Sequence, residues 1–242
     1  MIDTKSNQYA FIFAIIVCVV CGVLLSAVSE GLRKRQEINV DLDIKKNILK
    51  AVVLEVPIPQ KAKPQEVLEI YKTKIEEHVI DGQGNIIEGR KPADIKKGEK
   101  GVYPLYIYSE GGKVKSYAFP IVGQGLWSTL YGYLALEGDA TTVRGITFYK
   151  HGETPGLGAE IEKAWFQDNF KGKTIYSIKK QELTPIAVVK GKAADVYQDN
   201  PEAAKYHVDG ITAATITSSG VTEMMDRTLR AYEPYFSKVR KI

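Results

Sequence analysis

An uncharged apolar run at residues 9–28 dominates the hydropathy pattern at the start of the chain. About 20 apolar residues are enough for a helix to cross the hydrocarbon core of a bilayer. The pattern therefore predicts a short tail at residues 1–8 and a membrane-spanning helix at residues 9–28, which would contact lipid. A cleaved signal peptide is the alternative, because Ala27 and Ser29 offer small residues for cleavage. Against it, signal cores usually have only ~7–15 residues.

The predicted span contains Cys18 and Cys21, whose i,i+3 spacing places them on one helical face. As small apolar residues they suit a membrane helix. Metal ligands or redox thiols completed by a partner protein are the alternative. The span contains no ionisable residue, and intramembrane charge is the usual mark of an ion pathway. Any ion transport must therefore belong to partner proteins.

Beyond the span, apolar residues return at helical spacing and predict an amphipathic helix over residues 41–52. A lysine- and proline-containing stretch at residues 57–64 is predicted to be a linker. We assign residues 29–63 to a juxtamembrane helix and linker, and residues 64–242 to a soluble domain. Pro64 suits the first turn of a second helix. The buried face of that helix would carry Val67, Ile70, Tyr71, Ile75 and Val79.

The soluble part then becomes rich in strand patterns, with glycine, aspartate and proline between them. Helices are predicted at about residues 160–170 and 220–232. Strands gathered in a middle block, with helices at the ends and one between, indicate an α+β fold with a mostly antiparallel sheet and flanking helices. The predicted strands lie at residues 105–108, 113–118, 127–136, 143–149, 174–178 and 186–190.

Composition narrows the class of protein. The chain has 242 residues, 26% of them charged, and a formal net charge of +4. These values fit one globular domain with an appendage and exclude a disordered chain or a polytopic membrane protein. The longest basic block is Arg33-Lys34-Arg35, so we expect no nucleic-acid partner. Two cysteines exclude a disulfide scaffold and any multi-cysteine iron–sulfur or zinc module.

Most enzyme motifs are missing. The chain has no Walker phosphate loop and no GxSxG nucleophile motif. GQGLWS at residues 123–128 begins like a dinucleotide fingerprint, but serine replaces the third glycine and a strand pattern follows. His78, His151 and His207 lack metal-ligand spacing, so no metal ligand is assigned. A hydrolase built from His151, Glu153 and a serine remains as an enzymatic alternative.

Two segments have unusual composition. Residues 150–160 (KHGETPGLGAE) follow a predicted strand and are rich in glycine, which lets a backbone approach a flat ligand closely. Residues 209–220 (DGITAATITSSG) place five hydroxyl side chains just before the last predicted helix. Ser218 or Ser219 would cap that helix, which accounts for one or two of the hydroxyls. A phosphate beside the helix N-terminus would be favoured electrostatically.

These segments resemble known motifs. Residues 209–215 resemble the flavinylation motif D-x-x-(S/T)-(G/A)-A-T of FMN-binding domains, whose last threonine, here Thr215, carries FMN through a phosphodiester bond. HGETPGLG at residues 151–158 is similar to the companion motif of these domains. GLWSTLYG at residues 125–132 narrows the resemblance to the NqrC family, one of the subunit families of the Na+-translocating NADH:quinone reductases. The resemblance covers most of the chain. Ala213 is a departure, since glycine is commoner there.

The resemblance implies a covalently bound FMN as the cofactor. Because the cofactor supplies the redox chemistry, this chain needs no catalytic nucleophile, acid or base of its own. Asp209 and Thr212 would help to present Thr215, and Trp127 would either contact the flavin ring or lie in the core. The positions that match the cofactor-binding residues of such domains are Trp127, Glu153, Thr154, Leu157, Gly158, Asp209, Gly210, Thr212, Ala214 and Thr215.

The resemblance also implies partners and a location. A flavin transferase would attach FMN, with FAD as donor and magnesium. Electrons from NADH on another subunit would pass through this FMN to another membrane flavoprotein of the complex, with quinone reduction and sodium export elsewhere in it. The chain would be a single-pass protein of the cell inner membrane with its soluble domain in the periplasm. Flanking charge points the other way, because only Lys5 precedes the span and Arg33-Lys34-Arg35 follows it.

Two further interpretations stay open at this point. The chain could be an RnfG-type electron-transport protein or a regulatory membrane flavoprotein. It could also be a membrane-anchored binding module that carries no covalent cofactor.

Overall fold

The computed structural model describes residues 7–52, 63–96 and 98–240. The chain divides into two compact units, one ending at Ile44 and one running from Lys45. Helix α1 (Asn7–Ala51) is continuous, so the helix predicted at residues 41–52 is its last part. Most of the predicted tail and linker lie outside the described residues.

Helix α1 carries the apolar run. It is long and apolar enough to cross a membrane, and none of its most apolar segment is buried inside the protein. Phe11, Leu24 and Leu25 are each 60% exposed or more. Exposed apolar side chains in such number are typical of a lipid-facing helix.

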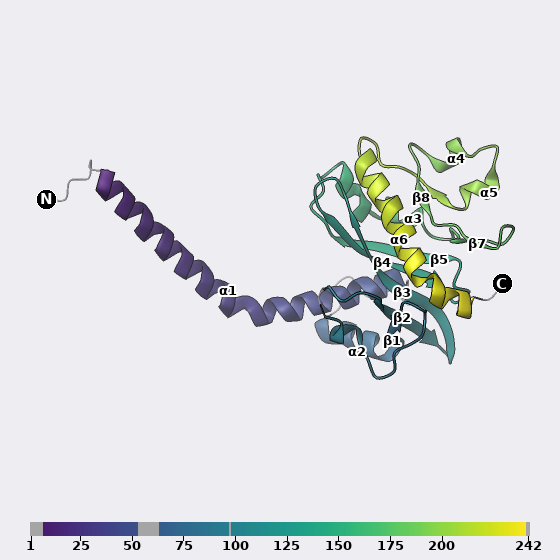
Figure 1. The fold of residues 1–242 in the computed structure, drawn as a ribbon, viewed down its shortest axis with the longest axis horizontal. Coiled ribbons are helices and arrows are strands. Elements are labelled where there is room, and N and C mark those ends of the chain that lie inside the picture. Colours follow the sequence, from purple (N-terminus) through teal and green to yellow (C-terminus); the bar gives the residue numbers. More distant parts are fainter. Residues whose placement is uncertain (1–6, 53–62, 97, 241–242) are drawn as a thin grey trace. The chain divides into compact units, whose positions relative to one another are not determined.

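The second unit is built on a five-stranded antiparallel meander (Figure 1). Its strands follow one another in chain order, each pairing with the next, so the predicted mostly antiparallel α+β fold is confirmed. The strands are β1 (Ile75–Asp81), β2 (Val102–Glu110), β3 (Lys113–Gln124), β4 (Thr129–Glu137) and β5 (Val143–Lys150).

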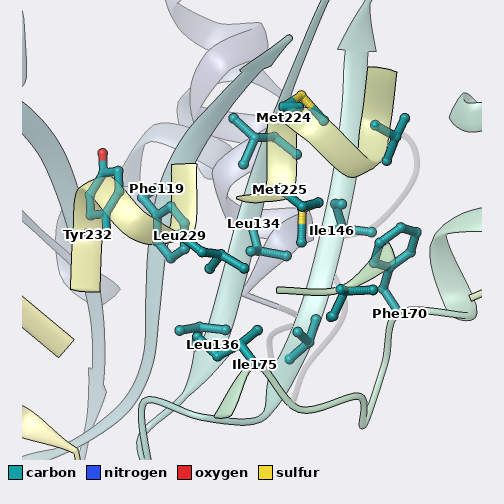
Figure 2. Close-up of a cluster of buried hydrophobic side chains, with 14 of the residues drawn as sticks. Phe119, Leu134, Leu136, Ile146, Phe170, Ile175, Met224, Met225, Leu229 and Tyr232 are labelled. Atoms are coloured by element: carbon teal, nitrogen blue, oxygen red, sulfur yellow. The ribbon is translucent and has the colours of Figure 1, made fainter. Parts of the chain in front are cut away.

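Helix α6 (Thr215–Val239) covers one face of this sheet (Figure 1). Side chains that alternate along the strands, such as Phe119 on β3 and Leu134 on β4, point toward it. Met224, Met225, Leu229 and Tyr232 of α6 lie in the same cluster (Figure 2). The tyrosine stacks on Phe119 with a centroid distance of 4.4 Å.

The opposite face of the sheet carries tyrosines. Tyr133 contacts Tyr106 and Tyr149, with ring centroids 6.0 and 5.6 Å apart. The end of α1 covers this face, because Thr147 donates a hydrogen bond to the Asn47 carbonyl. Helix α2 (Pro64–Lys74) packs beside β1 and β2. The sheet is therefore covered on both sides.

The region between β5 and α6 is made of short elements. Strands β8 and β9 pair in parallel, and β6 and β7 form a two-stranded antiparallel pair. In chain order the short elements of this region are η2 (Gly158–Glu162), α3 (Ala164–Asp168), β6 (Tyr176–Ser177), β7 (Glu182–Leu183), β8 (Ala187–Val188), α4 (Ala193–Val196), α5 (Pro201–Ala204) and β9 (His207–Val208). A further short helix, η1 (Pro92–Asp94), lies between β1 and β2.

The predicted extent of the second helix is wrong. Ile75 and Val79 lie in β1, not on the second helix, which ends at Lys74. Their spacing from Val67 and Tyr71 is helical, but pairing along β2 decides the conformation of these β-branched residues. The strands predicted at residues 174–178 and 186–190 are reduced to the short β6 and β8.

Candidate functional site

Helix α6 begins earlier than predicted. Its N-cap is Ala214, which offers no side-chain hydrogen bond to the first turn. The prediction that Ser218 or Ser219 caps the helix is therefore wrong, because both lie inside it. Thr215 is the first helical residue and is exposed. The first amide groups of a helix have no partner within it, so this exposed threonine stands where an anion is favoured.

The backbone just before Thr215 is constrained. Ala213 has a φ of 58°, in the left-handed region that glycine adopts at no steric cost. This conformation turns the loop after β9 into the first turn of α6. It also gives a physical reason for the preference for glycine at this position of the motif.

A buried carboxylate joins three segments around the start of α6. The Glu153 oxygens accept hydrogen bonds from the amides of residues 126–128, at 3.0 to 3.2 Å. They also accept one from the Thr217 hydroxyl at 2.6 Å. The loop before β4, the loop after β5 and the first turn of α6 are therefore held together by one side chain.

The charge of Glu153 is stabilised by these donors. Burial disfavours the charged form, but the Thr217 hydroxyl and the three amides outweigh it and hold the pKa of Glu153 below its ordinary value. A carboxylate that is held charged by donors suits a structural role better than a proton-transfer role.

The neighbouring His151 does not pair with the Glu153 carboxylate. Its Nδ1 accepts a hydrogen bond from the Glu153 amide at 3.2 Å, and its Nε2 lies 3.4 Å from a carboxylate oxygen of Glu162. Among the described residues, the structure therefore does not assemble the His151–Glu153 pair on which the hydrolase alternative depends.

Glycines permit this close packing. A Cβ on Gly158 would lie 2.6 Å from the Thr217 hydroxyl oxygen, and one on Gly125 would lie 2.5 Å from Glu153. A Cβ on Gly220 of α6 would lie 2.0 Å from the carbonyl oxygen of Gln124. Each glycine lets a backbone approach where a methyl group would collide.

The parallel pair β8–β9 places residues 187–191 beside the loop at residues 209–214, which precedes α6. The amide of Val189 donates to the Val208 carbonyl, and the amide of Gly210 donates to the Gly191 carbonyl. A side chain on Gly210 would collide with the Val189 carbonyl, 2.0 Å from its Cβ position. The Asp209 carboxylate accepts a hydrogen bond from the Ala193 amide at 2.8 Å, which fixes the start of the loop.

A pocket of about 640 Å³ lies between residues 188–191 and the first turn of α6. Thr215, Thr212, Lys190 and Ser218 are among its lining residues. The Ser218 hydroxyl is buried and has no hydrogen-bond partner among the described residues. An orphaned buried hydroxyl, an uncapped helix start and a lysine fit a phosphate group esterified to Thr215.

A second pocket of about 420 Å³ adjoins the first. The two pockets share Gly191, Ile211 and Thr212. The second is also lined by Gly156 and by Trp165, whose indole N–H donates to Glu160 at 2.9 Å. Both pockets are therefore lined by residues of the loop at residues 209–215.

The structure brings the sequence-predicted site residues to one end of the second unit. Trp127 is 70% exposed, which excludes a core position for it. Leu157 is 39% exposed. The Thr154 carbonyl accepts hydrogen bonds from the amides of Leu157 and Ala159, which closes the turn of their loop. Glu153, Gly158 and Ala214 are buried. Thr212 and Thr215 are exposed.

Two lining residues of the first pocket, Lys190 and Ser218, are not predicted as site residues from the sequence. Lys190 comes close to the loop before α6 through the pairing of β8 with β9, which no local sequence pattern predicts. Ser218 follows Thr215 by three residues and shares its helical face once the helix is known to start at Thr215. Ser218 could be placed next to Thr215 only once α6 is known to start at Thr215.

Comparison with known proteins identifies the family of the chain. The sequence model of the FMN-binding domain family matches residues 125–230, which include the glycine-rich loop at residues 150–160 and the start of α6. The chain is 31% identical to the NqrC protein of the Na(+)-translocating NADH-quinone reductase of Yersinia pestis, over 99% of this chain and 95% of that protein. It is 32% identical to the corresponding protein of Vibrio alginolyticus, over 91% of this chain and 90% of that protein.

Solved structures show the same fold. The crystal structure of NqrC from Parabacteroides distasonis aligns with a TM-score of 0.71 and 33% identity, over 85% of this chain and 97% of that one. Shewanella oneidensis NqrC aligns with a TM-score of 0.68 and 22% identity, over 81% of this chain and 96% of that one, which supports the fold alone. The chain therefore belongs to the NqrC family of Na(+)-translocating NADH-quinone reductases, as one subunit of an oxidoreductase complex.

Proposed function

We propose that this chain carries FMN covalently on Thr215 and relays electrons between subunits of a Na+-translocating NADH:quinone reductase. The observation that carries the proposal is the placement of Thr215. It is exposed at the uncapped start of α6, within the match to the FMN-binding domain family and beside a buried hydroxyl without a partner among the described residues. Family membership favours this function over an RnfG-type protein or a binding module without cofactor.

The residues around the proposed cofactor would have different roles. A bound FMN would supply one-electron chemistry that no side chain here provides. Asp209 and Thr212 would present Thr215 to the flavin transferase. The exposed apolar side chains of Trp127, at 70%, and Leu157, at 39%, offer surfaces for the ring. Glu153 would keep their loops in place, and none of these residues needs to exchange a proton.

In-gel fluorescence of the full chain tests the attachment. The chain is produced with an active flavin transferase, denatured and viewed under ultraviolet light. We expect a fluorescent band for the wild type and for Ser219→Ala, which removes another exposed hydroxyl of α6, but none for Thr215→Leu. A dark wild-type band, while a second substrate of the same transferase is labelled, would overturn the proposal.

We also propose that the soluble domain lies in the periplasm, with sodium export belonging to the assembled complex. An exported transferase requires that side of the inner membrane. Alkaline phosphatase and a cytoplasm-dependent fluorescent protein, fused in turn after residue 242, distinguish the two orientations. We expect an active phosphatase and a dark fluorescent fusion. The reverse pattern would show that Arg33-Lys34-Arg35 sets the orientation.

A further inference from the structure

The Ser218 hydroxyl is the feature of the site that the fold does not explain. Ser218 is only 6% exposed, and its Oγ has no hydrogen-bond partner among the described residues. A buried hydroxyl without a partner destabilises the folded state. Ser218 is among the residues that line the pocket of about 640 Å³ that also includes Thr215. Since the two residues are three apart on one helix, they lie on the same face.

Residues 188–191, which also line this pocket, are held in place by hydrogen bonds. The Val188 amide donates to the Thr222 hydroxyl of α6 at 2.9 Å, and that hydroxyl donates to the Ser218 carbonyl at 3.2 Å. The Gly210 amide donates to the Gly191 carbonyl at 2.8 Å. Residues 188–191, which include Lys190, are therefore attached to α6 at Val188 and to the loop at residues 209–214 at Gly191.

The charge of the pocket suits an anion. The described residues that line it include one cation, Lys190, and no carboxylate. The first turn of α6 contains no acidic residue either. The positive end of the helix dipole and one lysine thus act in the same direction, with no carboxylate among the described lining residues to cancel them.

We propose that this pocket is a phosphate-binding subsite in which the Ser218 hydroxyl and the Lys190 ammonium hold the phosphate group esterified to Thr215. The inference rests on the proposed function and assigns two residues to it that the flavinylation motif does not contain. Ser218 donates to a phosphate oxygen and so gains the partner that the described part of the protein does not provide. The Lys190 ammonium, from residues 188–191, pairs with the negative charge of the phosphate.

The test compares the full chain in detergent with and without covalent flavin. In the unmodified chain, Ser218→Ala removes an orphaned hydroxyl, and we expect the melting temperature to rise by about 2–4 °C. In the flavin-carrying chain the same substitution removes a bond to phosphate, and we expect that rise to disappear or reverse. Ser237→Ala, at an exposed serine of the same helix, is the matched control and should behave alike in both forms.

Phosphorus NMR of the flavin-carrying chain gives the second readout. We expect the phosphodiester resonance to shift in Ser218→Ala and in Lys190→Gln. Lys192→Gln is the control, because Lys192 lines the neighbouring pocket and not this one. The initial rate of flavin incorporation should fall roughly 3- to 10-fold in Lys190→Gln, as expected for losing about 1 kcal/mol of phosphate contact. Lys190 is exposed, so its substitution leaves the fold intact.

The outcomes separate this inference from the proposed function. A wild type that carries flavin, with Ser218→Ala equally stabilised in both forms and an unmoved phosphorus resonance in both variants, would overturn the subsite alone. A wild type that never carries flavin beside an active transferase would overturn both.

Discussion

At the scale of single residues, Glu153 shows how a buried charge can serve assembly rather than chemistry. Four donors from two other segments converge on its two oxygens, and three of them are backbone amides. A carboxylate without such donors would be costly to bury. These donors give a structural reason for a glutamate in this glycine-rich loop, beside the proposed flavin site.

Replacing Glu153 with glutamine tests this role. The amide side chain would place an NH2 group against N–H donors, and we expect a loss of about 2–4 kcal/mol in unfolding free energy at pH 7. Because the folded pKa is lowered, the carboxylate's contribution is present above its unfolded pKa of about 4.3 and is lost as the pH falls through the folded pKa. The difference between wild type and variant, measured by urea unfolding, should therefore shrink below about pH 4.3.

The control for that measurement is Glu223→Gln, at an exposed glutamate of the same helix as Thr217. It should change stability by less than about 0.5 kcal/mol at every pH. An equal effect of the two substitutions would contradict the role assigned to Glu153.

Ala213 supports a prediction of opposite sign. Its φ of 58° is unfavourable for a residue with a Cβ, so Ala213→Gly should raise the unfolding free energy by about 0.5–1 kcal/mol. Thermal melting of the unmodified chain measures it. Ala231→Gly, inside helix α6, should instead lower stability by about 1 kcal/mol. A loss of stability in both variants would show that the loop tolerates alanine without strain.

Trp127 supports a prediction about the cofactor. If the ring lies against this exposed indole, Trp127→Leu should raise flavin emission in the loaded chain several-fold, because a stacked indole quenches it. Trp165→Leu removes the other tryptophan of the chain and is the control. The steady-state intensity and the lifetime of flavin emission are measured in both variants. A rise only in Trp165→Leu would place the ring in the neighbouring pocket instead.

At the scale of elements, sequence patterns predicted the sheet and the motif loops better than their boundaries. The four long strands after η1 are apolar runs bounded by glycine, aspartate and proline, and these signals are detectable locally. The boundary at Lys74 depends on pairing between β1 and β2, which joins residues as far apart in the chain as Ile75 and Tyr108. Hydroxyl residues are weak helix formers, so the sequence of the first turn of α6 is typical of a loop. The hydrogen bond from Thr217 to Glu153, which depends on the fold, holds this turn in the helix.

The same reasoning covers the site. The residues of the Thr215 motif are contiguous, so a sequence pattern alone is enough to predict them. Lys190 comes from another segment, and the orphaned state of Ser218 depends on burial, so neither could be found without the fold.

Gly220 tests how α6 is seated on β3. Alanine normally favours a helix over glycine by about 1 kcal/mol. Here its Cβ would lie 2.0 Å from the Gln124 carbonyl oxygen, and we expect a net loss of about 1–3 kcal/mol in unfolding free energy. Ser219→Ala, one residue earlier and exposed, should be neutral or slightly stabilising. Chemical unfolding of both unmodified variants measures the difference, and a stabilised Gly220→Ala would refute the close approach.

At the scale of the whole molecule, the question is where the domain that bears the site begins. Sequence composition suggests residue 64, whereas the compact unit begins at Lys45. The last turns of α1 bury Ile48, Leu49 and Ala51 to 1% exposure or less. Arg144 on β5 also donates to the Val52 carbonyl, which attaches the end of this helix to the sheet.

Two truncated chains decide the boundary. A chain that begins at Lys45 keeps these contacts, and we expect it to be soluble without detergent and to accept flavin on Thr215. A chain that begins at Pro64 uncovers the tyrosine face of the sheet and loses several buried aliphatic side chains, at about 1.5–3 kcal/mol each before the entropy of ordering the segment is subtracted. We expect it to be about 3–6 kcal/mol less stable in urea unfolding. Equal stability of the two chains would mean that the end of α1 only rests on the sheet and that the domain begins at α2.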